Sequence, residues 1–334
     1  MTNRKIKINP TQSNQRIDKF LATFYDEKSR ASWQKMIKNK KVLVNDKKVK
    51  PDYILKEGDE VKILKPTDFS FLSVPLEMTK NEKLKIPKIE IIYEDDDVIA
   101  IDKPAGTLSQ KAESSKAPAI SDFLIEYYPK LKEVGEDEQR YGTVHRLDKD
   151  TSGIIIVAKN NKSFKFLKNQ FKNREVQKTY TALVYGDVKP KEGTIDLKIG
   201  RSKTKPNMQT VIDTKKKENI KSREALTLYK TIKNYKMDSE ARENVLGCEN
   251  YTLLEVQIKT GRMHQIRVHL KALGYPIIGD QKYFFKKYRN IEPKLGRQFL
   301  HAGKLKIKLP NRKIGVFESK LPKDLKNFLD KIND

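Results

Sequence analysis

Cysteine is almost absent from this chain of 334 residues, since Cys248 is the only one. An internal disulfide is therefore excluded, and so is a metal cluster built from the thiolates of one chain. We expect Cys248 to lie in a polar loop. No apolar run approaches the roughly 20 residues that a membrane-spanning helix needs. Residues 1–10 lack the apolar core of a signal peptide, so we expect a cytoplasmic protein without a membrane partner.

Acidic residues are too few to balance the basic ones. The chain has 70 lysines and arginines against 44 aspartates and glutamates, which gives a net charge of +26. So large an excess of cations repels itself unless a polyanion or counterions neutralise it. RNA, DNA or an anionic membrane would serve, and a generally lysine-rich composition is the alternative explanation for the size of the charge.

Residues 14–65 have the pattern of a compact unit of helices and strands. Its first predicted helix has an apolar stripe at i, i+3, i+4 and i+7, formed by Ile17, Phe20, Leu21 and Phe24. Ser29 is a suitable N-cap for a second helix. Arg30, Lys35 and Lys38 lie mostly outside the apolar stripe of that helix. These three residues predict a basic outer face on this helix.

The rest of the chain reads as a linker followed by one long domain. Residues 66–87 contain three prolines and little periodicity, which is typical of a linker. In residues 88–334 we expect strands at 89–93, 98–102, 154–158, 179–184 and 251–258, and helices near 120–127, 164–171, 263–273 and 322–329. Strands outnumber the crossovers that a doubly wound fold would need. The pattern therefore predicts an α+β domain with a large, mostly antiparallel mixed sheet.

A polar loop at 143–153 precedes the apolar run at 154–158. It contains a histidine, two basic residues, two aspartates, threonine, serine and glycine. So many polar groups beside a buried strand are costly unless each finds a partner, and loops of this kind usually carry function. His145 and Asp148 are its candidates for chemistry. The alternative is a turn whose side chains satisfy its own backbone.

A second polar cluster, at 259–270, lies where a predicted strand ends and a helix begins. We expect Arg262 in the first turn of that helix, which is unfavourable for a cation because the helix N-terminus is positive. A carboxylate partner would offset this, and Asp148 is our candidate. The alternative is an exposed arginine without a partner.

The four histidines all fall in polar motifs, which raises the question of a metal site. The sequence contains no HExxH motif and no Cys/His ligand spacing. His264 and His269 are five residues apart, off the i, i+4 face that helical ligands use. We therefore expect no metal.

The segment His145-Arg146-Leu147-Asp148, followed by Thr151-Ser152-Gly153, resembles the signature of RluA-type pseudouridine synthases. Further motifs resemble this family in the same order, at 103–106, 178–186, 260–269, 276–280 and 300–302. The resemblance covers roughly residues 88–320. It implies the pseudouridine synthase fold and the isomerisation of uridine in RNA, with Asp148 as the catalytic aspartate.

Residues 14–65 are similar to the αL RNA-binding module named after a ribosomal small-subunit protein. A module placed before the catalytic domain resembles the large-subunit ribosomal RNA branch of the family, the RluD-like and RluC-like enzymes. The resemblance implies that the partner is large-subunit ribosomal RNA or its assembly intermediate. We expect the enzyme to act as a monomer.

The resemblance also implies roles for further residues. Isomerisation needs no redox change and no group donor, so we expect no cofactor. Asp148 would attack the sugar or remove a proton beside its anomeric carbon, and Arg262 would favour the charged form of Asp148. Tyr180 would lie against the uracil. Arg146 would fill the place that the flipped base leaves.

A basic stretch at 201–211 is a further candidate for binding RNA. Arg201, Lys205 and Met208 would contact the strand, whereas a solvated basic hairpin is the alternative. The chain departs from the family in a polar insertion at 234–250 and in residues 108–110. We expect neither departure to touch the catalytic residues, and both leave the target uridine undefined.

Two other functions fit parts of this pattern. A metal-free RNA nuclease would use His145 and Asp148 as its acid-base pair. An RNA-binding protein with a decayed site would need only the module and the charge. The joint presence of Asp148, Tyr180 and Arg262 favours an intact enzyme over a decayed one.

Overall fold

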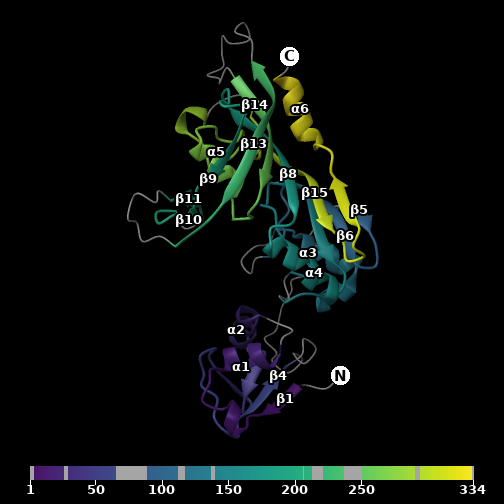
Figure 1. Ribbon diagram of the computed structural model, residues 1–334, viewed down its shortest axis with the longest axis vertical. Coiled ribbons are helices and arrows are strands. Elements are labelled where there is room, and N and C mark those ends of the chain that lie inside the picture. The colour runs from purple at the N-terminus through teal and green to yellow at the C-terminus, as the bar shows by residue number, and fades with distance from the viewer. Residues whose placement is uncertain are drawn as a thin grey trace, which may run out of the picture. The chain divides into compact units, whose positions relative to one another are not determined.

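The chain folds into two compact units, Met1–Leu84 and Lys85–Asp334, in the computed structural model of Figure 1. The structure describes residues 4–25, 29–64, 89–111, 117–136, 140–205, 207–212, 221–236, 250–289 and 294–332. The predicted linker at 66–87, Cys248 and most of the predicted insertion at 234–250 lie outside the described residues.

The N-terminal unit packs two helices on a small antiparallel sheet of order β1-β4-β2-β3. Its elements are β1 (Arg4–Lys7), the 3₁₀ helix η1 (Pro10–Gln12), α1 (Ile17–Phe24), α2 (Arg30–Lys38), β2 (Val42–Val44), β3 (Lys47–Lys48) and β4 (Glu60–Ile63). The predicted stripe of α1 is confirmed at Ile17, Phe20 and Leu21, which are buried, but Phe24 is 49% exposed. Ser29 caps α2 as predicted, because its side chain accepts from the backbone N–H of Ser32.

The larger unit is built on a nine-stranded mixed sheet of order β5-β6-β7-β15-β8-β14-β13-β9, with β16 beside β15. Its strands are β5 (Glu90–Glu94), β6 (Val98–Lys103), β7 (Ser152–Ala158), β8 (Gln177–Tyr185), β9 (Glu192–Asp196), β13 (Leu226–Lys236), β14 (Asn250–Ile258), β15 (Leu300–Lys308) and β16 (Ile314–Glu318). All of its pairings are antiparallel except that of β7 with β15. The predicted α+β class with a mostly antiparallel mixed sheet is confirmed.

Helices and a second small sheet flank the large sheet. They are α3 (Ile120–Tyr127), η3 (Pro129–Glu133), α4 (Asn161–Lys172), β10 (Ile199–Arg201), β11 (Gln209–Val211), β12 (Ser222–Arg223), α5 (Gln265–Ala272), η5 (Lys286–Tyr288) and α6 (Lys323–Lys331). Helix α4 packs against β7 and β15, and α5 packs against β11 and β13.

The apolar strand β7 forms the centre of the larger core. Every residue of β7 is buried, because it lies between β6 and β15 in the sheet and beneath α4. Burial on both faces explains why the sequence reads as an unbroken apolar run rather than an alternating one. The loop before this strand is thereby fixed at its C-terminal end.

Helix α5 begins at Gln265, two residues later than the sequence predicted. The delay has a local cause, since His264 adopts a left-handed backbone conformation with φ of 56°. The helix ends near Gly274, whose φ of 100° gives the left-handed turn that a glycine adopts without strain. Arg262 therefore lies before the helix, in the segment that leads from β14.

Candidate active site

Asp148 lies in the loop that runs into β7. Its side chain is 18% exposed and lines a cavity of about 360 Å³. The two other side chains predicted to take part in catalysis, Tyr180 and Arg262, line the same cavity, and so does Arg146. The structure therefore brings together side chains from three separate motifs of the sequence.

Lys103, at the end of β6, anchors the loop that carries Asp148. Its side chain is completely buried, and its ammonium group donates to the carbonyls of Pro104, Thr107 and Lys149 at 2.9, 2.8 and 2.8 Å. Burial lowers the pKa of Lys103 to about 7, while the charges of Asp150 and Asp148 act in the opposite direction. The motif at 103–106 thus holds the loop backbone next to the Asp148 carboxylate.

Ser109 provides a second anchor for this loop. Its hydroxyl donates to the carbonyl of Leu147 at 2.7 Å and accepts from the Leu147 N–H at 3.0 Å. Gln110 lines the cavity itself. Residues 108–110 therefore lie closer to the site than the sequence suggested, because Ser109 fixes the neighbour of Asp148 and Gln110 forms part of the wall.

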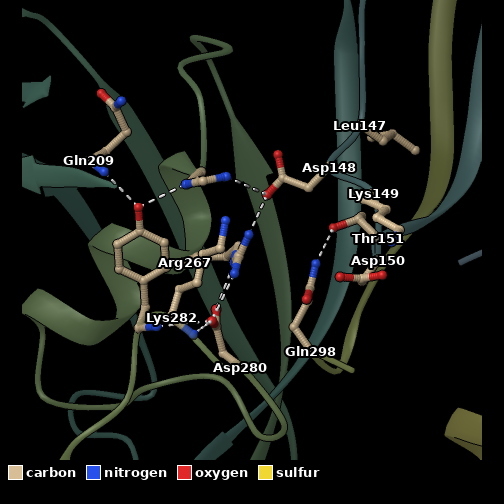
Figure 2. Close-up of polar contacts among 12 residues, drawn as sticks. Leu147, Asp148, Lys149, Asp150, Thr151, Gln209, Arg267, Asp280, Lys282 and Gln298 are labelled. Atoms are coloured by element: carbon tan, nitrogen blue, oxygen red, sulfur yellow. Dashed lines mark hydrogen bonds and ion pairs between the residues drawn. The ribbon is translucent and has the colours of Figure 1, made fainter. Parts of the chain in front are cut away.

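Arg267 is the arginine that pairs with Asp148. Its Nη1 donates to Asp148 Oδ2 at 2.9 Å, while Nε and Nη2 donate to Asp280 at 2.7 and 2.8 Å (Figure 2). Burial alone would lower the pKa of Arg267, but the two carboxylates raise it above its ordinary value. A fixed cation that bridges both carboxylates keeps the Asp148 side chain in one orientation.

Arg262 does not hold Asp148, so this part of the sequence-based prediction is wrong. Its Nε donates to the Glu224 carbonyl at 3.0 Å, and its backbone N–H donates to the Gln265 side chain. Because α5 starts at Gln265, the first-turn cation with carboxylate partners is Arg267 rather than Arg262. The signal for this pairing was Arg267 itself, a basic residue in a helix that is buried on nearly every side, where a charge needs a partner.

Tyr180 contributes a neutral phenol to the cavity. It lies on β8 and is 7% exposed. Burial, followed by the charge of Asp148, raises its pKa. The hydroxyl therefore stays protonated at neutral pH, where it can donate a hydrogen bond but cannot act as a phenolate base.

The His145 side chain makes structural contacts with β7 and α4. Its Nε2 accepts from the Ile156 N–H at 3.0 Å, and its ring stacks on Phe171 at 4.7 Å. Burial, together with the charge of Lys178, lowers its pKa to about 3. A neutral imidazole whose Nε2 is occupied cannot form the acid-base pair with Asp148 that a nuclease would need.

Cations surround the cavity and extend away from it. Arg146 is exposed, and Lys178 lines the wall with a pKa that burial lowers to about 8. Arg201 and Lys205 are exposed on the β10–β11 hairpin. Met208, in contrast, is partly buried and packs against a small buried cluster, and its contact with RNA stays a prediction.

The three residues of the predicted basic face of α2 differ in how far they are exposed to solvent. Lys38 is exposed and Lys35 is partly buried. Arg30 is half-exposed but forms an ion pair at 3.1 Å with Asp18, whose side chain is fully buried. Arg30 therefore reaches solvent from an anchored position on the N-terminal unit.

Asp18 ties three side chains of the N-terminal unit together. Burial would raise its pKa, but hydrogen bonds from Arg16, Gln34 and Arg30 lower it to about 2. The folded-state pKa is thus below the ordinary value of 3.8. Asp18 therefore stabilises the unit above that ordinary value, and this contribution is lost as the pH falls towards 2.

We expect the N-terminal unit to be less stable at about pH 2.5 than at about pH 6, with part of the difference due to Asp18. Trp33 is the only tryptophan and is buried in this unit, so its fluorescence during urea unfolding reports on the unit alone. In Asp18→Asn the difference should shrink, whereas Asp52→Asn, at an exposed site, should leave it unchanged. An undiminished difference in Asp18→Asn would contradict the assignment.

Neither a metal cluster nor a membrane segment is found in the described ranges. Within them, no group of three or more His, Cys, Asp or Glu side chains is arranged to hold a metal ion. No helix in the same ranges is both long enough and apolar enough to cross a bilayer.

Comparisons with known proteins agree with this geometry. Residues 97–272 match the family model described as RNA pseudouridylate synthase, and residues 15–61 match the S4 domain. The RNA pseudouridine synthase YlyB of Bacillus subtilis (strain 168) is 33% identical over 98% of this chain and 97% of its own. Ribosomal large subunit pseudouridine synthase C of Rickettsia bellii (strain RML369-C) is 34% identical over 92% of this chain and 94% of its own.

A solved structure gives the same result. Human RNA pseudouridylate synthase domain containing 4 superposes with a TM-score of 0.53 at 25% identity, covering 72% of this chain and 92% of that one. The mixed sheet and its cavity, with the αL unit before them, define an RNA-modifying isomerase. The chain belongs to the RluA-type RNA pseudouridine synthase family and carries an N-terminal S4 domain.

Proposed function

We propose that this enzyme isomerises uridines of large-subunit ribosomal RNA, with Asp148 as the catalytic carboxylate. The observation that carries the catalytic assignment is the ion pair of Asp148 with the buried Arg267 at 2.9 Å, at the wall of the cavity. The substrate assignment rests on relatives from two Rickettsia species, R. bellii and R. felis, both named ribosomal large subunit pseudouridine synthase C.

The reaction changes which atom of the uracil is bonded to the sugar, and the product has the same atomic composition as the substrate. The bond between the base nitrogen N1 and the sugar carbon C1′ breaks, the uracil turns, and its carbon C5 bonds to C1′. C5 releases a proton to solvent and N1 gains one, so atoms and electrons balance without a cofactor. Asp148 either attacks C1′ or removes the proton on the adjacent C2′, and both roles require the carboxylate that Arg267 stabilises.

The cavity walls suit a uracil that must be retained while it turns. Leu147 and Ile266 are both buried and line the cavity, which gives it apolar surfaces. Tyr180 presents its ring and its neutral hydroxyl from β8. Exclusion of water and loose contacts along the ring edge would let the base rotate without escaping.

Access to a paired uridine requires the base to leave its helix, at a cost of a few kcal/mol. Arg146 is exposed, lies two residues from Asp148 and lines the cavity. In our proposal its guanidinium occupies the position that the flipped base leaves. Arg201 and Lys205 on the β10–β11 hairpin would contact phosphates.

The N-terminal S4 domain supplies further phosphate contacts in this proposal, through Arg30, Lys35 and Lys38. We assign the RNA-binding domain to residues 14–65, the linker to 66–87 and the catalytic domain to 88–334. The match of residues 15–61 to the S4 domain supports the first of these assignments.

Deletion of residues 1–66 should weaken RNA binding and reduce its salt dependence. Each lost phosphate contact makes the negative slope of log K against log salt shallower, by about 0.9 on duplex and about 0.7 on single strands. Loss of three contacts therefore predicts a slope that is smaller in magnitude by roughly 2 to 3. Fluorescence anisotropy over a salt series measures both quantities, and circular dichroism checks that the remaining unit is folded. An unchanged slope would remove the S4 domain from the RNA interface.

The substrate assignment is tested by mapping pseudouridines in cells with and without the gene. We expect at least one pseudouridine of large-subunit ribosomal RNA to disappear and to return with the wild-type gene but not with Asp148→Asn. Persistence of every such pseudouridine, with loss of sites in transfer RNA instead, would overturn the assignment to ribosomal RNA.

A further inference from the structure

A chain of polar contacts leads from Asp148 to the β10–β11 hairpin. His264 Nε2 lies 3.9 Å from Asp148 Oδ2, and His264 Nδ1 lies 2.8 Å from the Tyr283 hydroxyl. The same hydroxyl accepts the backbone N–H of Gln209, the first residue of β11, at 2.7 Å (Figure 2). Nothing in the reaction described above accounts for these contacts.

The contacts determine where the protons lie. The Tyr283 hydroxyl already accepts from Gln209, and Tyr283 is only 2% exposed, so its own hydrogen needs a buried acceptor. Among the residues that the structure describes, the acceptor within reach is Nδ1 of His264. Burial lowers the pKa of His264, so the imidazole is neutral and carries its single proton on Nε2, the nitrogen that faces Asp148.

His264 is held in this orientation from two directions. Its backbone has a φ of 56°, a conformation that costs a non-glycine residue of the order of 1 kcal/mol or more and that clusters at functional sites. Its ring packs edge-on against Tyr283, with centroids 5.4 Å apart. The strained backbone directs the ring at Asp148, and Tyr283 fixes its rotation.

Tyr283 also supports the other partner of Asp148. The Arg267 guanidinium lies over the Tyr283 ring at 5.1 Å, and the Tyr283 N–H donates to Asp280 at 3.0 Å. Both groups that approach Asp148 thus rest on one aromatic side chain. Because the base of the hairpin packs with Tyr283 in a shared buried cluster, the hairpin and the site form a continuous packed unit.

The arrangement distinguishes the two carboxylate oxygens of Asp148. Arg267 bonds to Oδ2 and His264 faces Oδ2, while in the described part of the chain no donor bonds to Oδ1. We propose that His264, in the Nε2–H tautomer set by Tyr283 and Gln209, is a positioning residue that keeps Oδ2 occupied and leaves Oδ1 as the oxygen that reacts with the ribose. This inference rests on the proposed catalytic role of Asp148.

The tautomer can be tested without any activity. In full-length protein with ¹⁵N-labelled histidine at neutral pH, the Nδ1 of His264 should have the chemical shift of an unprotonated acceptor and Nε2 that of an N–H. His264→Gln identifies the signals by their loss. A proton on Nδ1 in the wild-type enzyme would overturn the proposal even if Asp148 proves to be catalytic.

Kinetics test the positioning role. We expect Tyr283→Phe and His264→Leu each to lower kcat about tenfold, as for loss of a contact that orients a reacting group without touching the substrate, with KM nearly unchanged. His264→Gln should retain most of the rate, because its amide nitrogen reaches the position of Nε2. Tyr275→Phe is the matched control, since its hydroxyl accepts the Lys189 N–H at 3.3 Å away from the cavity.

Two results would overturn the positioning role. One is a Tyr283→Phe enzyme whose kcat equals that of the wild type and of Tyr275→Phe. The other is an equal loss in His264→Gln and His264→Leu, which would indicate packing alone. Retention of full activity by Asp148→Asn would instead remove the proposed function, and the tautomer measurement would still stand by itself.

Discussion

Asparagine in place of Asp148 is expected to lower kcat at least about 1,000-fold, since loss of a group that reacts with substrate typically has effects of this size or larger. The substitution is nearly isosteric, and its amide oxygen can still accept the bond that Arg267 Nη1 now donates at 2.9 Å. Folding and RNA affinity should therefore change little. The dissociation constant for RNA should stay within about threefold, because phosphate contacts supply most of the affinity.

Asp150→Asn is the matched control for this experiment. Asp150 belongs to the same loop but is not among the residues that line the cavity. We expect the Asp150 variant to lose less than about tenfold in kcat, because it can affect the site only through the loop. Comparable losses in both variants would mean that loop charge, rather than the Asp148 carboxylate, supports the reaction.

Replacing Arg267 by glutamine should affect both stability and catalysis. Asp280 is fully buried and would lose its cationic partner, which typically costs about 3 to 5 kcal/mol of unfolding free energy. Asp148 would lose its only ion pair with an arginine among the described residues. We expect kcat to fall about 100-fold or more, as when a fixed charge-assisted contact beside a reacting group is removed.

A second substitution separates these two effects. The double variant Arg267→Gln/Asp280→Asn removes the unpaired buried charge, so urea unfolding should show most of the stability restored while kcat remains low. Arg262→Gln should lose less than about tenfold in kcat, because its guanidinium bonds to the Glu224 carbonyl rather than to a reacting group. A larger kcat loss in Arg262→Gln than in Arg267→Gln would contradict the pairing seen here.

The sequence predicted the site to the level of its motifs but not of its pairings. The apolar run of β7 identified the central strand, and the polar loop before it offered His145 and Asp148, of which the family resemblance selected Asp148. The choice of Arg262 failed because the left-handed conformation of His264 shifts the start of α5, and no periodicity reveals a single backbone angle. With α5 beginning at Gln265, Arg267 rather than Arg262 lies in its first turn.

Long-range pairing was also beyond the sequence pattern. Lys103 donates to a carbonyl 46 residues away, and β15 pairs in parallel with β7 through His301 and Ser152, far apart in the chain. Strands β9, β13, β15 and β16 were not predicted. Their residues alternate between buried and exposed over short stretches, and register between distant strands depends on tertiary packing rather than on local composition.

The most direct test of the central claim uses RNA that carries tritium on carbon C5 of its uracils. Because the new bond to the sugar forms at C5, each isomerisation must release one tritium to water. With enzyme in excess, we predict release that equals the pseudouridine found after digestion, from RNA of unchanged length, and none of it with Asp148→Asn. Cleaved RNA, free uracil or undiminished release by Asp148→Asn would contradict an isomerase that works through this carboxylate.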